Sequence, residues 1–216
     1  MRIIYTINGT DLATLGITVT AADGLLDLPA PRERTKQEWS DMHGDMISHS
    51  APTYGSRSIE LHCTMVCPTP EFFIQASRTL HNLFFCGDLL RLVVTIGSKS
   101  LYYLVYLNGE IEYGRKWAGG QILASFTLHL CEPEPFKRIY KATAKSVTLT
   151  VSKCATPVNV YWGNERTSID YDMGVGSITH TFSDYADKKE HIVIITGDIH
   201  NLTSNMTNST LVWNLL

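Results

Sequence analysis

Alternating apolar and polar residues predict a series of strands along this chain. In residues 59–67, IELHCTMVC, apolar side chains occupy every second position, and residues 122–130 repeat the alternation. A period of two is typical of a strand with one buried face. Two more continuous apolar runs, 89–96 and 101–107, predict deeply buried strands that Gly97–Ser100 joins as a hairpin.

A single segment, about 70–85, has helical periodicity. Thr69 can cap it, Pro70 suits the first helical position, and apolar residues then recur at helical spacing until Gly87. A lone amphipathic helix has to bury its apolar face against a sheet. The pattern therefore predicts a mainly β (α+β) fold, with an N-terminal β-sandwich or barrel-like domain that carries one packed helix.

The pattern breaks at Glu132-Pro133-Glu134-Pro135, because two prolines one residue apart cannot continue a paired strand. We expect a boundary just after it and two domains, residues 1–140 and 141–216. The second domain is expected to be a small all-β sandwich. Its five short apolar runs, each bounded by Gly, Asn, Asp or Ser, are 147–151, 158–162, 177–182, 191–196 and 211–216.

Residues 27–57 have little periodicity of either kind. A loop of this length without structure is uncommon in a compact monomer, so either its own aromatic residue packs it or a partner orders it. We favour the partner. Trp39 in this segment and Trp117 beside two glycines are candidate anchors of a subunit interface. Trp162 and Trp213, which lie at the ends of apolar runs, are expected to fill the core.

Charge is sparse along the chain. Eighteen Lys and Arg against 21 Asp and Glu give a net charge of −3, and 18% of residues are charged, where soluble domains average about 25%. No basic run suits tight binding of nucleic acid or anionic membrane, and no apolar stretch approaches the roughly 20 residues of a membrane span. We expect no signal peptide, and five cysteines suit free thiols in a reducing cytoplasm.

The candidate chemical groups have simpler structural interpretations. Cys63 and Cys67 lie on one face of a predicted strand, roughly 13 Å apart and too far for one zinc ion, so we expect two core thiols. No nucleophile elbow or phosphate loop occurs. We predict no catalytic residue, no cofactor and no metal. The remaining groups are interpreted as loop charges or surface histidines: Glu132 with Glu134, Asp170 with Asp172, His129 and His180.

The order of these features resembles the N-terminal domain of bacteriophage distal tail proteins. The resemblance covers roughly residues 1–140 and is most distinctive at Trp39, Asp41 and Gly44, followed by the strand that begins at Arg57. It implies a non-enzymatic structural protein of a phage or prophage tail, usually a hexameric ring, that joins the tail tube to the baseplate and host-recognition proteins.

Further expectations come with this resemblance. DNA would pass through the lumen of the ring without specific binding, and the protein, made in the host bacterial cytoplasm, would reside in the virion tail without contacting a membrane. The candidate subunit-interface residues are Trp39, Asp41, Arg57 and Trp117.

The C-terminal part is similar to a polycystic-kidney-disease-type β-sandwich, an adhesion or spacer module. The run VNVYWGNE, residues 158–165, carries Asn164-Glu165 where that pattern has Asp-Gly, and Phe182 replaces a Tyr. An alternative function stays open. The chain could be a monomeric carbohydrate-binding or adhesion β-sandwich that uses Trp117 or Trp162.

Overall fold

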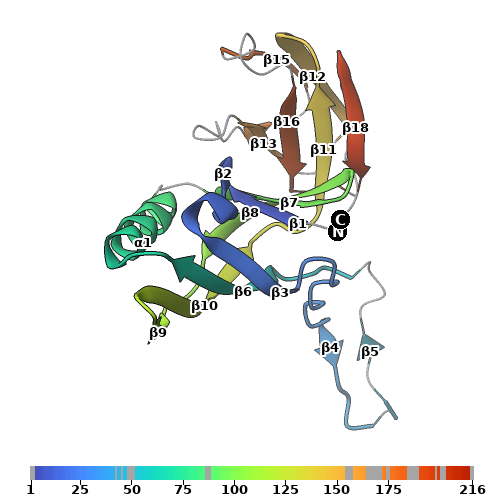
Figure 1. Cartoon of the computed structure of the whole chain (residues 1–216). Helices are drawn as coiled ribbons and strands as arrows, with labels where there is room; N and C mark the ends of the chain where they lie inside the picture. Colours follow the sequence, from blue (N-terminus) through green and yellow to red (C-terminus); the bar gives the residue numbers. More distant parts are fainter. Residues whose placement is uncertain are drawn as a thin grey trace.

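The structure is a computed structural model that describes residues 3–41, 43–44, 46–47, 52–85, 89–153, 158–163, 172–173, 176–183, 190–197, 199 and 203–214. It confirms a mainly β (α+β) chain, with antiparallel sheets and, in these ranges, one α-helix (Figure 1). The strands are β1 Ile3–Ile7, β2 Thr10–Asp11, β3 Ile17–Asp23, β4 Lys36–Gln37, β5 Met46–Ile47, β6 Arg57–Cys67, β7 Leu90–Ile96, β8 Lys99–Leu107, β9 Gly114–Ala118, β10 Gln121–Glu132, β11 Lys137–Ala142, β12 Ser146–Lys153, β13 Val158–Gly163, β14 Asp172–Met173, β15 Gly176–Thr181, β16 His191–Thr196, β17 Thr203–Met206 and β18 Ser209–Asn214.

The N-terminal part is an eight-stranded sheet curved around one core. Its order is β2-β1-β7-β8-β10-β6-β3, with β9 paired to β10. β8 meets β10 through two residue pairs, Leu107 with Leu130 and Tyr106 with Cys131, so the sheet turns there. One apolar cluster takes side chains from both halves, which gives the expected barrel-like arrangement. β2 and β3 are the two ends of this sheet, and the 3₁₀ helix η1, Leu12–Leu15, lies between them in the chain.

The longest ladder confirms the two alternating runs. β6 and β10 pair without a break from Cys67–Ile122 to Arg57–Glu132. Ile59, Leu61 and Met65 point into the core, while the residues between them face outward or are half-buried. The alternation therefore sets which face of this sheet is dry.

The predicted helix and hairpin are confirmed as well. Helix α1, Pro70–Phe84, begins at Thr69, whose hydroxyl accepts a hydrogen bond from the Phe72 N–H at 3.2 Å. It buries Ala76 and Leu80 against the sheet. β7 and β8 form the predicted hairpin, and Gly97 in its turn has φ +61°. Among the described residues, no helix is long and apolar enough to cross a membrane.

The C-terminal part is the expected small β-sandwich. A five-stranded sheet, β14-β13-β16-β11-β18, shares one apolar core with a three-stranded sheet, β15-β12-β17. Each of the five predicted runs contains a strand, although residues 215–216 lie outside the described part. Three strands of this part were not predicted: β11, β14 and β17.

β11 spans the position where we expect the domain boundary. It pairs with β16 on one side and β18 on the other, so residues 137–140 belong to the C-terminal sheet. The division into two domains stays a prediction. The two parts touch through an apolar cluster of Leu104, Ile139, Tyr161 and Ile194.

Candidate subunit-joining surface

A hairpin that we call the arm, residues 24–56, leaves the sheet after β3 and returns at β6 (Figure 1). At its root the Arg32 N–H donates to the Thr53 carbonyl at 2.7 Å, and the Gly55 N–H donates to the Ala30 carbonyl at 2.9 Å. Farther from the root β4 pairs with β5, and the arm continues beyond this pairing (Figure 1). The segment without periodicity is thus a thin two-stranded extension, and its described middle has no sheet beneath it.

Glycine is required where the arm leaves the sheet. Gly24 has φ +81°, and a Cβ atom there would lie 2.0 Å from the Ser58 carbonyl oxygen. Both the backbone conformation and the contact exclude a side chain. The direction in which the arm starts is therefore fixed by backbone packing against β6.

Large apolar side chains are exposed along the arm. Leu26 is 72% exposed, Trp39 50% and Met46 59%, and Leu28 and Ile47 are exposed too. A two-stranded hairpin is marginally stable on its own in water, and contiguous exposed apolar surface marks interaction sites. The arm therefore has the properties of a segment that another surface covers.

The four candidate interface residues do not form one cluster. Trp39 and Asp41 are exposed on the arm, and Trp117, 68% exposed, lies on β9 at a separate place on the sheet (Figure 1). Arg57 is 5% exposed and lies inside the chain. In this conformation Arg57 contributes to the root of the arm and not to an outer surface, and the interface role of all four stays a prediction.

Arg57 belongs to a buried group of charges. Its guanidinium lies 3.7 Å from the Glu132 carboxylate, and the Lys137 ammonium donates to the other oxygen of that carboxylate. Glu132 is fully buried and Lys137 nearly so. The Lys137 Nζ also lies 4.5 Å from the centre of the Tyr103 ring.

Our interpretation of Glu132 as a solvated loop charge is wrong, and Glu134 lies in the predicted loop but is half-buried and hydrogen-bonded. Glu132 ends β10 on its buried face, and Glu134 accepts hydrogen bonds from the Asn159 amide, at 3.3 Å, and from the Thr196 hydroxyl. The alternation of apolar and polar positions in β6 and β10 could have indicated that Glu132 is buried. Continued by one step, it places both Glu132 and Arg57 on the core face of their strands.

Burial sets the protonation behaviour of this group. It raises the pKa of Tyr103 to about 12 and raises the pKa of Glu132, which the positive charges of Lys137 and Arg57 pull back down. It also lowers the pKa of Lys137, against the attraction of Glu132. Burial is thus the larger influence on both pKa values, and the opposite charge of each partner offsets part of its effect.

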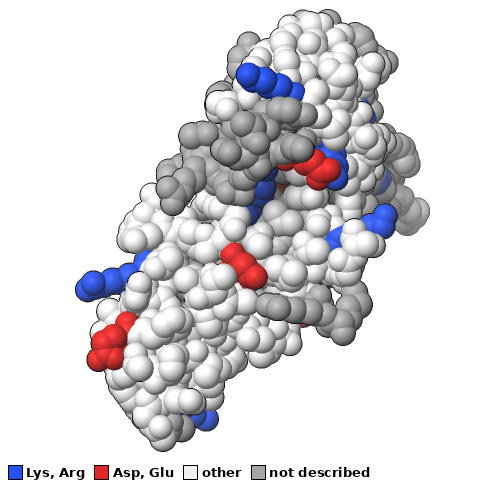
Figure 2. Space-filling model, turned by 45° about the horizontal axis from the view of Figure 1, so that its top comes forward, with Lys and Arg blue, Asp and Glu red and all other residues white. Residues whose placement is uncertain are grey.

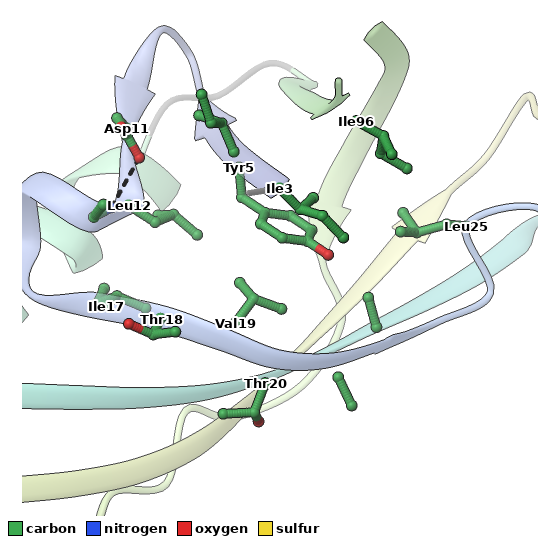
Figure 3. A pocket seen from close by; sticks show the side chains of 14 residues that line it. Ile3, Tyr5, Asp11, Leu12, Ile17, Thr18, Val19, Thr20, Leu25 and Ile96 are labelled. Atoms are coloured by element: carbon green, nitrogen blue, oxygen red, sulfur yellow. Dashed lines mark hydrogen bonds between the residues drawn. The ribbon is translucent and has the colours of Figure 1, made fainter. Parts of the chain in front are cut away.

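Two hollows of about 540 Å³ each flank the curved sheet. Figure 3 shows the first, where apolar side chains of β1, η1 and β3, among them Ile3, Leu12 and Val19, point toward one another. The second lies on the outer face of β6 and β10 and contains His62 and His129. Its polar lining and the apolar lining of the first mark two different surfaces of one sheet.

The histidines of the second hollow pair with carboxylates. His62 Nε2 is 3.2 Å from Asp23, and His129 Nδ1 is 3.5 Å from Glu60, which confirms His129 as a surface histidine. No group of three or more His, Cys, Asp or Glu residues that could hold a metal ion occurs in the described ranges.

Cys63 and Cys67 are the buried core thiols that we expected. They lie on the same face of β6, and burial raises the pKa of Cys63 to about 12. A thiol with such a pKa is almost entirely protonated near neutral pH, so it is a poor nucleophile.

The two tryptophans that we expected in the core differ: Trp162 is buried, and Trp213 is only partly so. Trp162 is 3% exposed in the sandwich core, as predicted, so it cannot stack on a sugar. Trp213 is half-buried and packs against two apolar clusters. His180 stacks on Trp162 with ring centres 4.9 Å apart, which corrects our interpretation of it as an ordinary surface residue.

Of the remaining carboxylate pair, Asp170 lies outside the described residues and Asp172 is in β14.

Comparison with known proteins gives likenesses of structure alone. No protein-family model and no curated protein matches the sequence. Among solved structures, the chain is similar to the Dit protein (gp 19.1) of phage SPP1, described as a paradigm of the hub adsorption apparatus in phages that infect Gram-positive bacteria. The TM-score is 0.49, with 13% identity over 91% of this chain and 98% of that one. It is also similar to chains of the phage p2 baseplate in its activated conformation, with Sr (TM-score 0.44, 10% identity, 97% of this chain and 98% of that one) and with Ca (0.46, 9%, 100% and 88%).

Proposed function

We propose that this protein is a non-enzymatic structural component of a phage or prophage tail that forms a ring through its arm. The observation that carries the proposal is the arm itself, an exposed hairpin with large apolar side chains and a fixed root. The resemblance of residues 17–57 to distal tail proteins supplies the biological setting. In that setting the ring, expected to be a hexamer, joins the tail tube to the baseplate and host-recognition proteins.

The distribution of exposed residues supports a ring. A closed ring formed head to tail requires two different patches on every subunit. Trp39 on the arm and Trp117 on β9 are large, exposed and located on separate elements. We assign them to the two sides of the subunit contact.

The sparse charge fits the same role. Figure 2 shows a face on which charged side chains are few and most are separated by uncharged surface. Interface cores are depleted of charged residues relative to other surface, and a conduit without basic clusters does not hold DNA through its phosphates. We therefore propose that DNA passes through the ring without specific binding.

The C-terminal sandwich is proposed as an accessory module that projects from the ring. Its two packed sheets agree with an adhesion or spacer module, and the likeness to polycystic-kidney-disease-type sandwiches stays a prediction because Asn164 and Glu165 lie outside the described residues.

Electron microscopy and light scattering of the purified protein test the proposal. We expect rings of about six subunits, alone or after mixing with the neighbouring tail proteins. Trp39→Ala should shift rings to monomers without changing the far-UV circular dichroism, because a truncated aromatic anchor costs about 2 kcal/mol or more. Leu211→Ala, at an exposed apolar site on β18, is the matched control and should leave the rings intact.

A strictly monomeric protein at high concentration, with those partners present, would contradict the ring. Trp117, with its 68% exposed side chain, then favours the carbohydrate-binding alternative. A glycan array would test that activity, and Trp117→Ala should abolish any binding that the array detects.

A further inference from the structure

The buried charges lie where two connections of the fold meet. Arg57 is the first residue of β6, where the arm returns to the sheet. Glu132 ends β10 and Lys137 begins β11, so both flank the passage from the eight-stranded sheet to the C-terminal sheet. A single carboxylate, that of Glu132, forms an ion pair with a cation from each connection: a hydrogen-bonded pair with Lys137 and a longer one with Arg57 at 3.7 Å.

The same group of residues also binds the segment by which the arm leaves the sheet. The Leu25 carbonyl, one residue beyond Gly24, accepts hydrogen bonds from Arg57 Nη1 at 3.1 Å and from the Tyr103 hydroxyl at 2.7 Å. The ring of Tyr103 in turn lies under the Lys137 ammonium. Both strands of the arm are therefore bonded to one cluster, which also contains the first residue of β11.

A second contact joins the arm to the same passage. The rings of Tyr54, on the returning strand of the arm, and Phe136, immediately before β11, lie with centres 5.1 Å apart. Apolar packing and buried charge thus connect the same two segments of chain. Because both kinds of contact join the same two segments, the ion pairs are part of a larger connection between the arm and the start of β11.

Stability alone does not account for three buried charges. Replacing a buried ion group with apolar side chains of similar size is often neutral or stabilising, because the charges lose their hydration. What charges add is directional bonding, since each must keep its partners at a fixed geometry or be left unpaired.

We propose that Arg57, Tyr103, Glu132 and Lys137 are positioning residues of the arm, forming a joint that sets its direction and couples its root to the C-terminal sheet. The inference deepens the proposed ring, because an arm with a fixed direction reaches a neighbouring copy at one place. In the ring, a change in how the C-terminal sheet packs on the eight-stranded sheet is accompanied by a change in the direction of the arm.

Hydrogen exchange of the purified chain tests the joint without depending on assembly. In the double variant Glu132→Gln/Lys137→Met the closest ion pair of the group is removed as a unit, while Arg57 keeps its hydrogen bond to the Leu25 carbonyl. We expect amide exchange in 24–32 and 52–57 and in β11 to become at least about fivefold faster, the factor that one lost hydrogen bond represents. Exchange in the centre of the β6–β10 ladder should stay unchanged.

A milder variant keeps the test decisive if the double variant does not fold. Tyr103→Phe removes only the hydroxyl bonded to Leu25 and keeps the ring under Lys137, so faster exchange should be confined to the arm root. The control is Lys141→Met/Glu190→Gln, which removes an exposed ion pair of 2.7 Å elsewhere on β11 and should change neither segment.

The outcomes separate this inference from the proposed function. If Tyr103→Phe leaves arm exchange at the wild-type rate, or if the double variant speeds exchange uniformly over the whole chain, the joint is refuted even where rings form. If arm exchange responds as expected but the wild-type protein never assembles, the joint holds and the ring is wrong. Where rings do form, the double variant should assemble more weakly than the control.

Discussion

Single residues determine how the arm begins, and Gly24 is the most constrained of them. Its positive φ and its 2.0 Å approach to the Ser58 carbonyl each exclude a Cβ atom. Gly24→Ala should lower the free energy of unfolding by about 3 kcal/mol, more than backbone strain alone. Gly119 offers a matched control, because it also has a positive φ, +56°, but has no atom near the position of its Cβ.

Urea denaturation of both variants checks this difference. Gly119→Ala should cost about 1 kcal/mol, the strain of a left-handed conformation without a collision. Equal losses in the two variants would show that the sheet yields at Ser58 and that the exit of the arm is not fixed by packing.

His180 is the residue through which pH acts on the sandwich. Burial and then the nearby His191 lower its pKa from 6.5. Below pH 6.5 the unfolded chain therefore takes up a proton that the folded chain does not, so stability falls as the pH falls. Thermal unfolding followed through Trp162 should show a lower midpoint at pH 5 than at pH 7.5.

The matched variant for this effect is His180→Phe, which keeps an aromatic ring between Trp162 and Phe182. Its melting temperature should depend less on pH than that of the wild type. The same slope in both proteins would assign the pH dependence to other groups.

At the scale of elements, helix α1 illustrates what local sequence specifies. Thr69 accepts from the Phe72 N–H at the first turn, so Thr69→Ala should cost about 1 kcal/mol of unfolding free energy. Thr79→Ala lies in the same helix, where the hydroxyl bonds back to the Gln75 carbonyl, and should cost nothing or stabilise slightly. Chemical denaturation would contradict the capping role if the two substitutions had equal effects.

Strong periodicity made the long elements predictable. The ladder of β6 and β10, helix α1 and the β7–β8 hairpin follow from alternation, capping and turn residues that act within a few positions. β17 reads TSNM and buries one side chain, Met206, so its pairing with β12 supplies the structure that its own pattern does not.

Neither the buried charges of the joint nor the strands of the arm could be predicted from the sequence. A charged residue is normally read as exposed, yet Lys137 and Glu132 are buried because each supplies the other's counter-charge. The strands of the arm, β4 and β5, are two residues long, too short for any periodicity. Of the candidate interface residues, Trp39 and Trp117 could be chosen from sequence because a tryptophan outside a strand pattern has no core position to fill.

At the scale of the whole molecule, Arg91 of β7 supplies hydrogen bonds to the contact between the two parts. Its guanidinium donates to the Gly163 carbonyl at 3.1 Å and to the Ile192 carbonyl at 3.2 Å, so it ties the eight-stranded sheet to β13 and β16. A Cβ atom on Gly163 would lie 1.6 Å from this guanidinium, so the approach depends on glycine. The contact is polar at its edge and apolar at the cluster of Leu104 and Tyr161.

Removing the guanidinium should therefore uncouple the two parts. Hydrogen bonds from a charged donor are worth about 1.5–3 kcal/mol each, so Arg91→Met should weaken the contact by about 3 kcal/mol while keeping its apolar stem. We expect hydrogen exchange in the variant to rise in β13 and β16 before it rises in β6 and β10, whereas the wild type is expected to lose protection in both parts together. Arg78→Met, on the exposed face of α1, is the control, and in this variant the two parts should still lose protection together. If Arg91→Met also kept the two parts coupled, the apolar cluster and the joint at Glu132 would hold the sandwich on the sheet without the guanidinium.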